Sequence, residues 1–236
     1  MKNKYIFILS LTIVCSLLLS LASEGLRSLK EKNVEIDKKK NILNAIGLNI
    51  TSLSNSDIDK YFSNNIDTVI IDINGEINNF LTISDLVAIE NNQTGEVKYY
   101  NNDNEYLPMY EDNSRSVVVL PISGKGLWST LFGYFAIDSR NYSTVRGITF
   151  YKHKETPGLG GEVSKKWFQS NFIGKEIYEN NNLNSVKVAK AGYADENSLY
   201  EVDGISGATI TSNGVTTFLL RDLKRYEKYF MRNSDE

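Results

Sequence analysis

Four hydroxyl side chains and three glycines crowd into the stretch VDGISGATITSNGV, residues 202–215, directly before an amphipathic C-terminal segment. The hydroxyls belong to Ser206, Thr209, Thr211 and Ser212. A glycine-rich loop that enters a helix collects unpaired backbone N–H groups at the positive end of the helix dipole, which favours phosphate. Thr211, Ser212 or Asn213 can serve as the N-cap of this segment. The same residues also suit a capping turn without a ligand. The composition alone leaves both alternatives open.

Seven of these residues, Asp203-Gly204-Ile205-Ser206-Gly207-Ala208-Thr209, resemble a flavin-attachment motif. The motif belongs to the FMN-binding domain shared by the C subunit of the sodium-translocating NADH:quinone reductase and the G subunit of the Rnf electron-transport complex. In that family the threonine that ends Ser-Gly-Ala-Thr carries FMN through a phosphoester bond, and its counterpart here is Thr209. The resemblance implies that a separate, magnesium-dependent flavin transferase moves FMN from FAD onto this hydroxyl.

The resemblance also defines the residues that we expect to bind the cofactor in this loop. They are Asp203, Ser206, Gly207, Ala208, Thr209 and Thr211. Three roles are open for Asp203: recognition by the transferase, orientation of the loop, and formation of the turn before Gly204.

A second segment of the same family is HKETPGLGGEV, residues 153–163, which follows a predicted strand and precedes a predicted helix near residues 165–169. Its proline restricts the backbone and its three glycines remove side-chain bulk, so main-chain amides can lie against or beside a flat ring. We therefore expect the isoalloxazine ring here, with Thr156 and Leu159 as its main contacts. The predicted cofactor-binding residues of this segment are Glu155, Thr156, Pro157, Gly158, Leu159 and Gly160.

Several residues near these motifs have a second interpretation. Glu155 and Glu162 are also consistent with solvated loop carboxylates. The single histidine, His153, is expected to be structural, because one-electron transfer requires neither an acid nor a base. Trp128 and Trp167 are predicted to be core aromatics, with the alternative that Trp167 shields the flavin.

Three further stretches favour the sodium-pump subunit over the Rnf subunit. They are DKKKNIL (37–43), GLWSTLFGY (126–134) and EVDGISGATITSNGV (201–215). The resemblance implies a flavoprotein that relays electrons through covalent FMN within a sodium-pumping NADH:quinone oxidoreductase, with the other subunits as partners and no turnover of its own. The alternatives are the Rnf subunit and a membrane-tethered binding or assembly module without flavin.

The N-terminus contains eighteen consecutive uncharged residues, Tyr5 to Ala22, preceded by Lys2 and Lys4. As a helix this run approaches the thickness of a bilayer's hydrocarbon core, roughly 30 Å. It predicts a transmembrane anchor in the cell inner membrane over residues 1–25, and the alternative is a cleaved signal peptide. The two lysines favour a cytoplasmic N-terminus, which places the FMN domain on the periplasmic side.

The rest of the chain divides into a predicted helical stalk or linker, residues 26–55, and an FMN-binding domain, residues 56–236. The Asn-rich residues 91–104 indicate an exposed hairpin or loop. Apolar residues recur at helical spacing from Val215 to Phe230, and a shorter helix is expected at 57–64.

The predicted fold class is α+β, with a mainly antiparallel sheet and flanking helices. Several of the predicted strands lie too close together in the sequence for crossover helices, which favours antiparallel pairing. They are Thr68–Ile73, Ser116–Ile122, Leu131–Asp138, Thr144–Tyr151 and Ser185–Lys190.

Other classes of protein fit poorly. A net charge of −3 argues against a general nucleic-acid binder, which normally carries a basic surface. One cysteine, Cys15, supports neither a disulfide framework nor a cysteine-based metal site. The sequence also lacks a Walker-type or dinucleotide-binding fingerprint.

Overall fold

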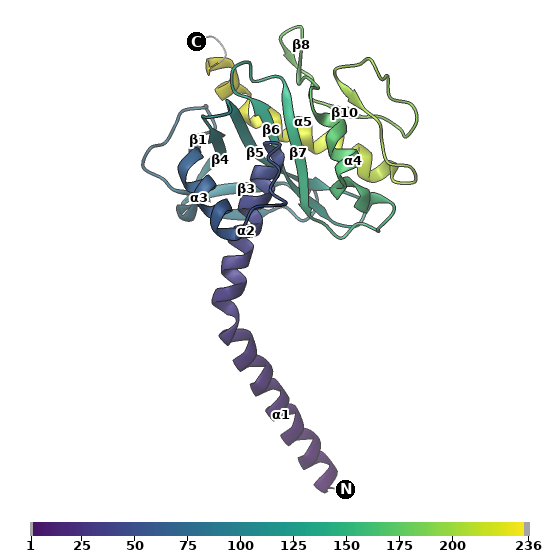
Figure 1. The fold of residues 1–236 in the computed structure, drawn as a ribbon. Coiled ribbons are helices and arrows are strands. Elements are labelled where there is room, and N and C mark those ends of the chain that lie inside the picture. Colours follow the sequence, from purple (N-terminus) through teal and green to yellow (C-terminus); the bar gives the residue numbers. More distant parts are fainter. Residues whose placement is uncertain (1, 234–236) are drawn as a thin grey trace. The chain divides into compact units, whose positions relative to one another are not determined.

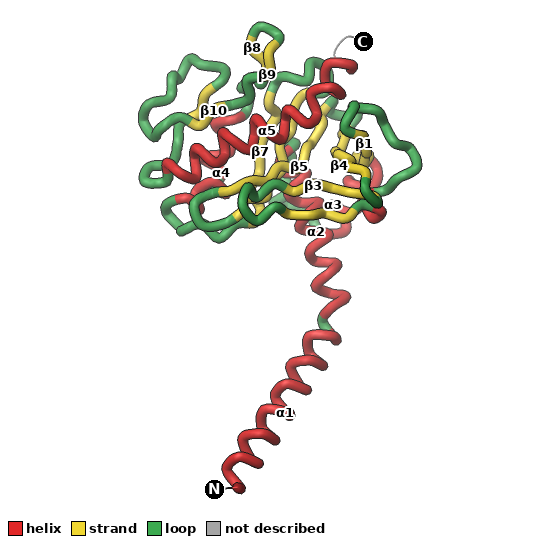
Figure 2. The backbone as a smooth tube through the Cα atoms, turned by 180° about the vertical axis from the view of Figure 1, so that it is seen from behind, coloured by secondary structure: helices red, strands yellow, loops and turns green. Residues whose placement is uncertain are grey.

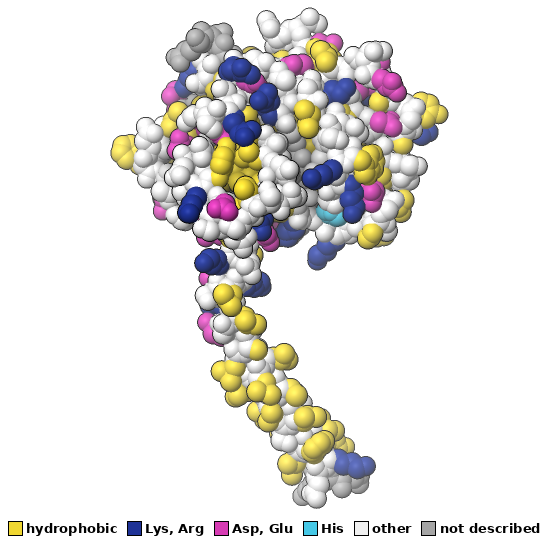
Figure 3. Space-filling view, in the orientation of Figure 1, with side chains coloured by type: hydrophobic (Ala, Val, Ile, Leu, Met, Phe, Trp, Pro, Cys, Tyr) yellow, Lys and Arg dark blue, Asp and Glu magenta, His cyan; other side chains and the backbone are white. Residues whose placement is uncertain are grey.

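The computed structural model describes residues 2–233 of the chain, which consists of two compact units, residues 1–39 and 40–236. The first unit contains α1 (Lys2–Gly25) and most of α2 (Arg27–Ala45). Over Asn3–Gly25, α1 is long and apolar enough to cross a membrane. Figure 3 shows apolar side chains along its length, as an anchor helix requires.

The second unit is built on a seven-stranded sheet (Figure 1). The strand order is β2-β3-β4-β5-β6-β7, β1 pairs with β4, and all these pairings are antiparallel. The predicted α+β fold class is therefore confirmed. The strands are β1 (Ile66–Asp72), β2 (Val87–Glu90), β3 (Val97–Asn101), β4 (Asn104–Asp112), β5 (Val117–Lys125), β6 (Thr130–Asp138) and β7 (Val145–Lys152).

Four of the five predicted strands correspond to β1, β5, β6 and β7. The Asn-rich region contains the predicted hairpin, formed by β3 and β4, and Asn102 at its turn adopts a φ of 52°. The fifth predicted strand shortens to β10 (Lys187–Val188), which lies outside the main sheet and pairs in parallel with β11 (Glu201–Val202). β10 therefore pairs with the strand that leads into the hydroxyl-rich loop.

Helices cover both faces of the sheet (Figures 1 and 2). The long α5 (Thr209–Asn233) crosses one face, and residues 40–46 together with α3 (Asn55–Asn65) cover the other. Two glycines make this close packing possible. A Cβ on Gly124 would collide with the ring of Phe218 on α5, and a Cβ on Gly147 would collide with the carbonyl oxygen of Ala45.

The strand alternation of β5 divides the core into two apolar layers. Val118 and Leu120 belong to the layer under α5, and Val117 and Val119 belong to the layer on the opposite face. Each fully buried side chain of this size contributes roughly 1.5–3 kcal/mol. The layer under α5 fixes this helix against the sheet, and with it the loop that precedes it.

The remaining elements are short. α3 begins with a capping box in which the Ser54 Oγ accepts from the N–H of Asp57 at 3.2 Å and the Asp57 carboxylate accepts from the N–H of Ser54 at 3.2 Å. The other elements are η1 (Ile83–Asp85), η2 (Gly160–Ser164), α4 (Lys166–Gln169), η3 (Ser170–Phe172), β8 (Tyr178–Glu179) and β9 (Asn182–Leu183).

Candidate functional site

The hydroxyl-rich loop leads directly into α5, whose first residue is Thr209. The side chains of Ser206 and Thr209 are exposed. The first backbone bond of the helix runs from the N–H of Ser212 to the carbonyl of Ala208 at 3.0 Å. The N–H groups of residues 209–211 therefore have no acceptor inside the helix and are directed toward the loop. The exposed Thr209 hydroxyl thus lies where the helix dipole favours a phosphate.

The N-cap predicted at Thr211, Ser212 or Asn213 is wrong, because the helix begins earlier than expected. All three residues lie inside its first turns. The buried Ser212 hydroxyl accepts from the N–H of Ile205 at 3.3 Å and so holds the loop against the helix.

The two motif segments, separated in the sequence, lie against each other. A Cβ on Gly207, whose φ is 73°, would lie 2.8 Å from the Leu159 Cδ2. A Cβ on Gly160 would lie 2.7 Å from the Thr211 Oγ1. The positive φ favours glycine at position 207, and at position 160 a side chain would press on buried Thr211 and Glu155. The two segments together form one surface around Thr209.

Glu155 lies beneath this surface and is only 5% exposed. The interpretation of Glu155 as a solvated loop carboxylate is therefore wrong. Its carboxylate accepts hydrogen bonds from the Trp128 N–H at 2.9 Å and the Thr211 hydroxyl at 2.9 Å, among other donors. Burial raises the pKa of Glu155, but hydrogen bonds from the N–H groups of residues 127–129 and from Thr211 outweigh burial and hold its pKa below the ordinary value.

Thr211 and Asp203 support the loop from within the protein. Thr211 is 1% exposed, and its hydroxyl is directed at Glu155 rather than at the surface. The Asp203 carboxylate accepts from the N–H of Gly192 at 2.7 Å, which ties the motif to the loop that follows β10. Of the three roles open for Asp203, this contact supports orientation of the loop.

The surface around Thr209 is rich in exposed apolar side chains. Leu127 is 46% exposed, Trp128 69%, Leu159 43% and Ile210 59%. Thr156, Pro157 and Gly158 are exposed as well. This combination of an exposed hydroxyl, helix N–H groups without an acceptor inside the helix, and exposed apolar side chains suits a phosphorylated ligand with an apolar ring system.

The prediction that both tryptophans are core residues is wrong, since Trp167 is also 48% exposed. Its Nε1–H donates to the Glu162 carboxylate at 3.0 Å, and the same carboxylate accepts from the N–H of Gly158 at 3.2 Å. Glu162 is half-buried and therefore braces the Gly158 turn. His153 has a similar supporting contact, because its Nδ1 accepts from the N–H of Glu155 at 3.2 Å.

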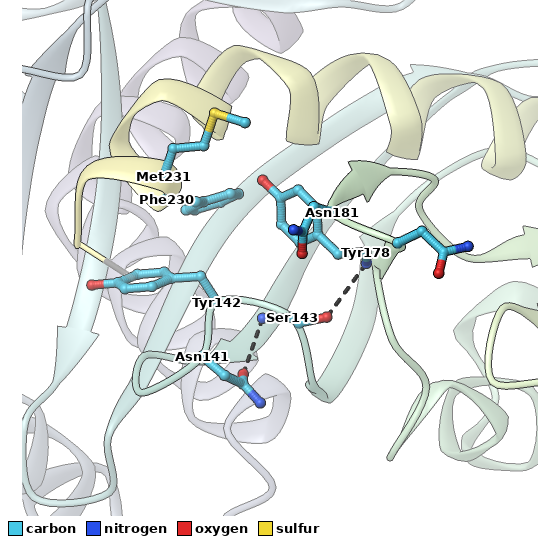
Figure 4. Close-up of a pocket in the computed structure, with 8 residues that line it drawn as sticks. Asn141, Tyr142, Ser143, Tyr178, Asn181, Phe230 and Met231 are labelled. Atoms are coloured by element: carbon cyan, nitrogen blue, oxygen red, sulfur yellow. Dashed lines mark hydrogen bonds between the residues drawn. The ribbon is translucent and has the colours of Figure 1, made fainter. Parts of the chain in front are cut away.

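A separate pocket of about 700 Å³ lies at the other end of α5 (Figure 4). The hydroxyl of Tyr178 is buried and has no hydrogen-bond partner within residues 2–233. The pocket contains none of the motif residues. It is lined by Asn141, Tyr142, Ser143, Tyr178, Asn180, Asn181, Phe230 and Met231.

Known proteins resemble this chain in sequence over most of its length. Residues 126–223 match a sequence model of the FMN-binding domain. The chain is 32% identical to the C subunit of the Na(+)-translocating NADH-quinone reductase of Vibrio anguillarum, over 91% of this chain and 87% of that protein. It is 34% identical to the C subunit of the Yersinia pestis enzyme, over 87% of this chain and 82% of that protein.

A crystal structure of the C subunit of the Na(+)-translocating NADH-quinone reductase from Parabacteroides distasonis has the same fold. It superposes with a TM-score of 0.70 at 31% identity and covers 87% of this chain and 96% of that chain. By sequence over most of its length and by fold, the chain belongs to the family formed by the C subunits of Na(+)-translocating NADH-quinone reductases.

Proposed function

We propose that this chain is the subunit of a sodium-pumping NADH:quinone oxidoreductase that carries FMN in phosphoester linkage on Thr209 and relays electrons between other subunits. The observation that carries the proposal is the position of Thr209, which is exposed at the first residue of a 25-residue helix and adjoins the second family segment. Membership of the C-subunit family and the match to the FMN-binding domain support the cofactor and the complex.

The residues of the site divide into two groups by the part of FMN that they would hold. The first turn of α5 offers its free N–H groups, Thr209 to Thr211, to the phosphate. The exposed side chains of Trp128 and Leu159 offer apolar area to the ring system. FMN bound in this way supplies reversible transfer of one or two electrons, and the protein tunes it through burial, stacking and hydrogen bonds.

Formation of the phosphoester requires an accessible hydroxyl group. A flavin transferase must reach the Thr209 hydroxyl, and this side chain is exposed. Thr211, two residues further, is buried and engaged with Glu155, so it is a poor acceptor for the same group. The geometry therefore favours attachment at Thr209 over Thr211, the other threonine at the start of α5.

Flavin fluorescence in a denaturing gel tests this attachment. The chain is produced together with a flavin transferase, and covalent flavin should remain fluorescent after denaturation. Thr209→Ala should abolish the signal. Thr217→Ala, a change at an exposed threonine on the same helix, should retain it. A colourless wild-type chain would instead support a binding or assembly module without flavin.

We also propose that α1 anchors the chain in the membrane with the FMN domain on the periplasmic side. The length and apolar character of Asn3–Gly25 support the anchor. The experiment is fractionation followed by protease treatment of spheroplasts. The intact N-terminus should appear in the membrane fraction and the domain should be degraded from outside. A soluble chain that lacks its first residues would show that the segment is a signal peptide.

A further inference from the structure

The Glu155 carboxylate joins two elements of the site through its two oxygens. Its Oε1 accepts from the Trp128 N–H at 2.9 Å, from the Ser129 N–H at 2.9 Å and from the Ser129 hydroxyl at 3.2 Å. Its Oε2 accepts from the Leu127 N–H at 3.2 Å and from the Thr211 hydroxyl at 2.9 Å. One anion therefore binds three successive amides of the loop before β6 and the first turn of α5.

Two glycines approach this carboxylate closely. A Cβ on Gly126 would lie 2.7 Å from the Glu155 Oε1, and a Cβ on Gly160 would lie 2.7 Å from the Glu155 Oε2. Hydrogen bonds to an ionised acceptor are roughly twice as strong as neutral ones. Loss of the acceptor would leave partly buried N–H donors unpaired, which costs more than the bonds themselves contribute.

We propose that Glu155 is a positioning residue. It fixes Leu127–Ser129 against the first turn of α5, so that the exposed side chains of Leu127 and Trp128 border the Thr209 site, and it does not contact the flavin itself. The proposal rests on the proposed function only for the identity of the ligand at Thr209. It also gives a role to Thr211, because this side chain connects the first turn of α5 to the same anion.

Amide exchange in the flavin-free chain tests the positioning directly. The full-length Thr209→Ala chain in detergent serves as the reference. Adding Glu155→Gln keeps the side-chain size but replaces one acceptor oxygen by a donor. The amides of Leu127, Trp128 and Ser129 should then exchange at least about tenfold faster.

Asp222→Asn is the matched control, because it neutralises another buried carboxylate, one that lies on α5 itself. Asp222 is 3% exposed and accepts from the N–H of Ser123 rather than from the loop. This variant should leave exchange at residues 127–129 unchanged. Equal acceleration in Asp222→Asn would mean that neutralising either buried carboxylate opens residues 127–129, so the effect would not be specific to Glu155 and the proposal would be overturned.

A second experiment uses the chain with Thr209 intact, produced together with a flavin transferase. Glu155→Gln should lower the fraction of chains that carry FMN and alter the fluorescence intensity and circular dichroism of the flavin that is bound. Thr211→Val keeps the anion and removes only its link to α5, so it should give a weaker form of both effects even where Glu155→Gln fails to fold. Thr211→Ser restores a hydroxyl and should restore both measurements.

The outcomes separate this proposal from the proposed function. Unchanged amide exchange and unchanged flavin spectra in Glu155→Gln would refute the positioning role. A wild-type chain without flavin, in which the loop amides still depend on Glu155, would refute the proposed function and leave the positioning role standing.

Discussion

Asp222 is a buried carboxylate on α5 whose ionisation should be visible in the pH dependence of stability. Its Oδ2 accepts from the N–H of Ser123 at 2.8 Å, and its Oδ1 accepts from the guanidinium of Arg221 at 2.7 Å. Burial raises the pKa of Asp222 from 3.8 to about 6, although Arg221 and the Ser123 N–H oppose this rise.

The sign and the magnitude of the effect follow from this pKa. A carboxyl group whose pKa is higher in the folded state binds its proton more tightly there. Its stabilising contribution is therefore complete below about pH 4 and is lost as the pH rises through about 6. A rise of about two pKa units corresponds to about 3 kcal/mol. The variant Asp222→Asn cannot ionise at this position. We predict that its free energy of unfolding minus that of the wild type rises by about 3 kcal/mol from about pH 4 to about pH 7.

The assay is urea unfolding of both chains in the same detergent over this pH range. The difference between the two chains cancels the pH-dependent contributions of the carboxylates that both chains contain. One of these is Asp138, whose pKa is held at about 2 chiefly by its hydrogen bond from Arg140. A difference that stays flat with pH would refute the reasoning. So would a difference that moves in favour of the wild type as the pH rises.

Three further substitutions test individual contacts. Gly147→Ala drives a Cβ against the Ala45 carbonyl and should cost about 1–3 kcal/mol, so an unchanged melting temperature in calorimetry would contradict this packing. Ser54→Ala removes the hydroxyl cap of α3 and should cost about 1 kcal/mol in urea unfolding, and no loss would mean that the cap does not form. Gly207→Ala places a Cβ at a φ of 73° inside the hydroxyl-rich loop and should lower flavin content, measured by absorbance. Gly174→Ala has a φ of 79° outside the site and is its control; equal flavin content in both variants would count against the role of Gly207.

The local pattern of the sequence predicted most of the fold because the central strands alternate or are apolar throughout. β5 and β6 are almost entirely buried, β7 is buried over most of its length, and all three carry the β-branched and aromatic residues that sheets favour. β2 was not predicted, because all four of its residues are exposed and show no inward-facing pattern. The N-terminal boundary of α5 was placed too late, because a helix can start without the side-chain cap that marks it in a sequence.

The sequence predicts which residues belong to the candidate site but not which hydrogen bonds their side chains make. The motifs pointed to Thr209, and the structure brings both motif segments to it. The environment of Glu155 depends on donors at residues 127–129 and at Thr211, which are distant in the sequence. The prediction that Trp128 is a core residue is wrong for the same reason. A large aromatic side chain is usually buried, and only the fold shows that this one lies in an exposed turn.

Mass spectrometry of the peptide that contains Thr209 is the most direct test of the central claim. The chain should be purified from cells that express a flavin transferase, with Thr209→Ala as the control. The account predicts the mass of an FMN phosphoester on Thr209 in the wild-type peptide and a bare peptide in the variant. A bare wild-type peptide, or flavin on a different residue, would contradict it.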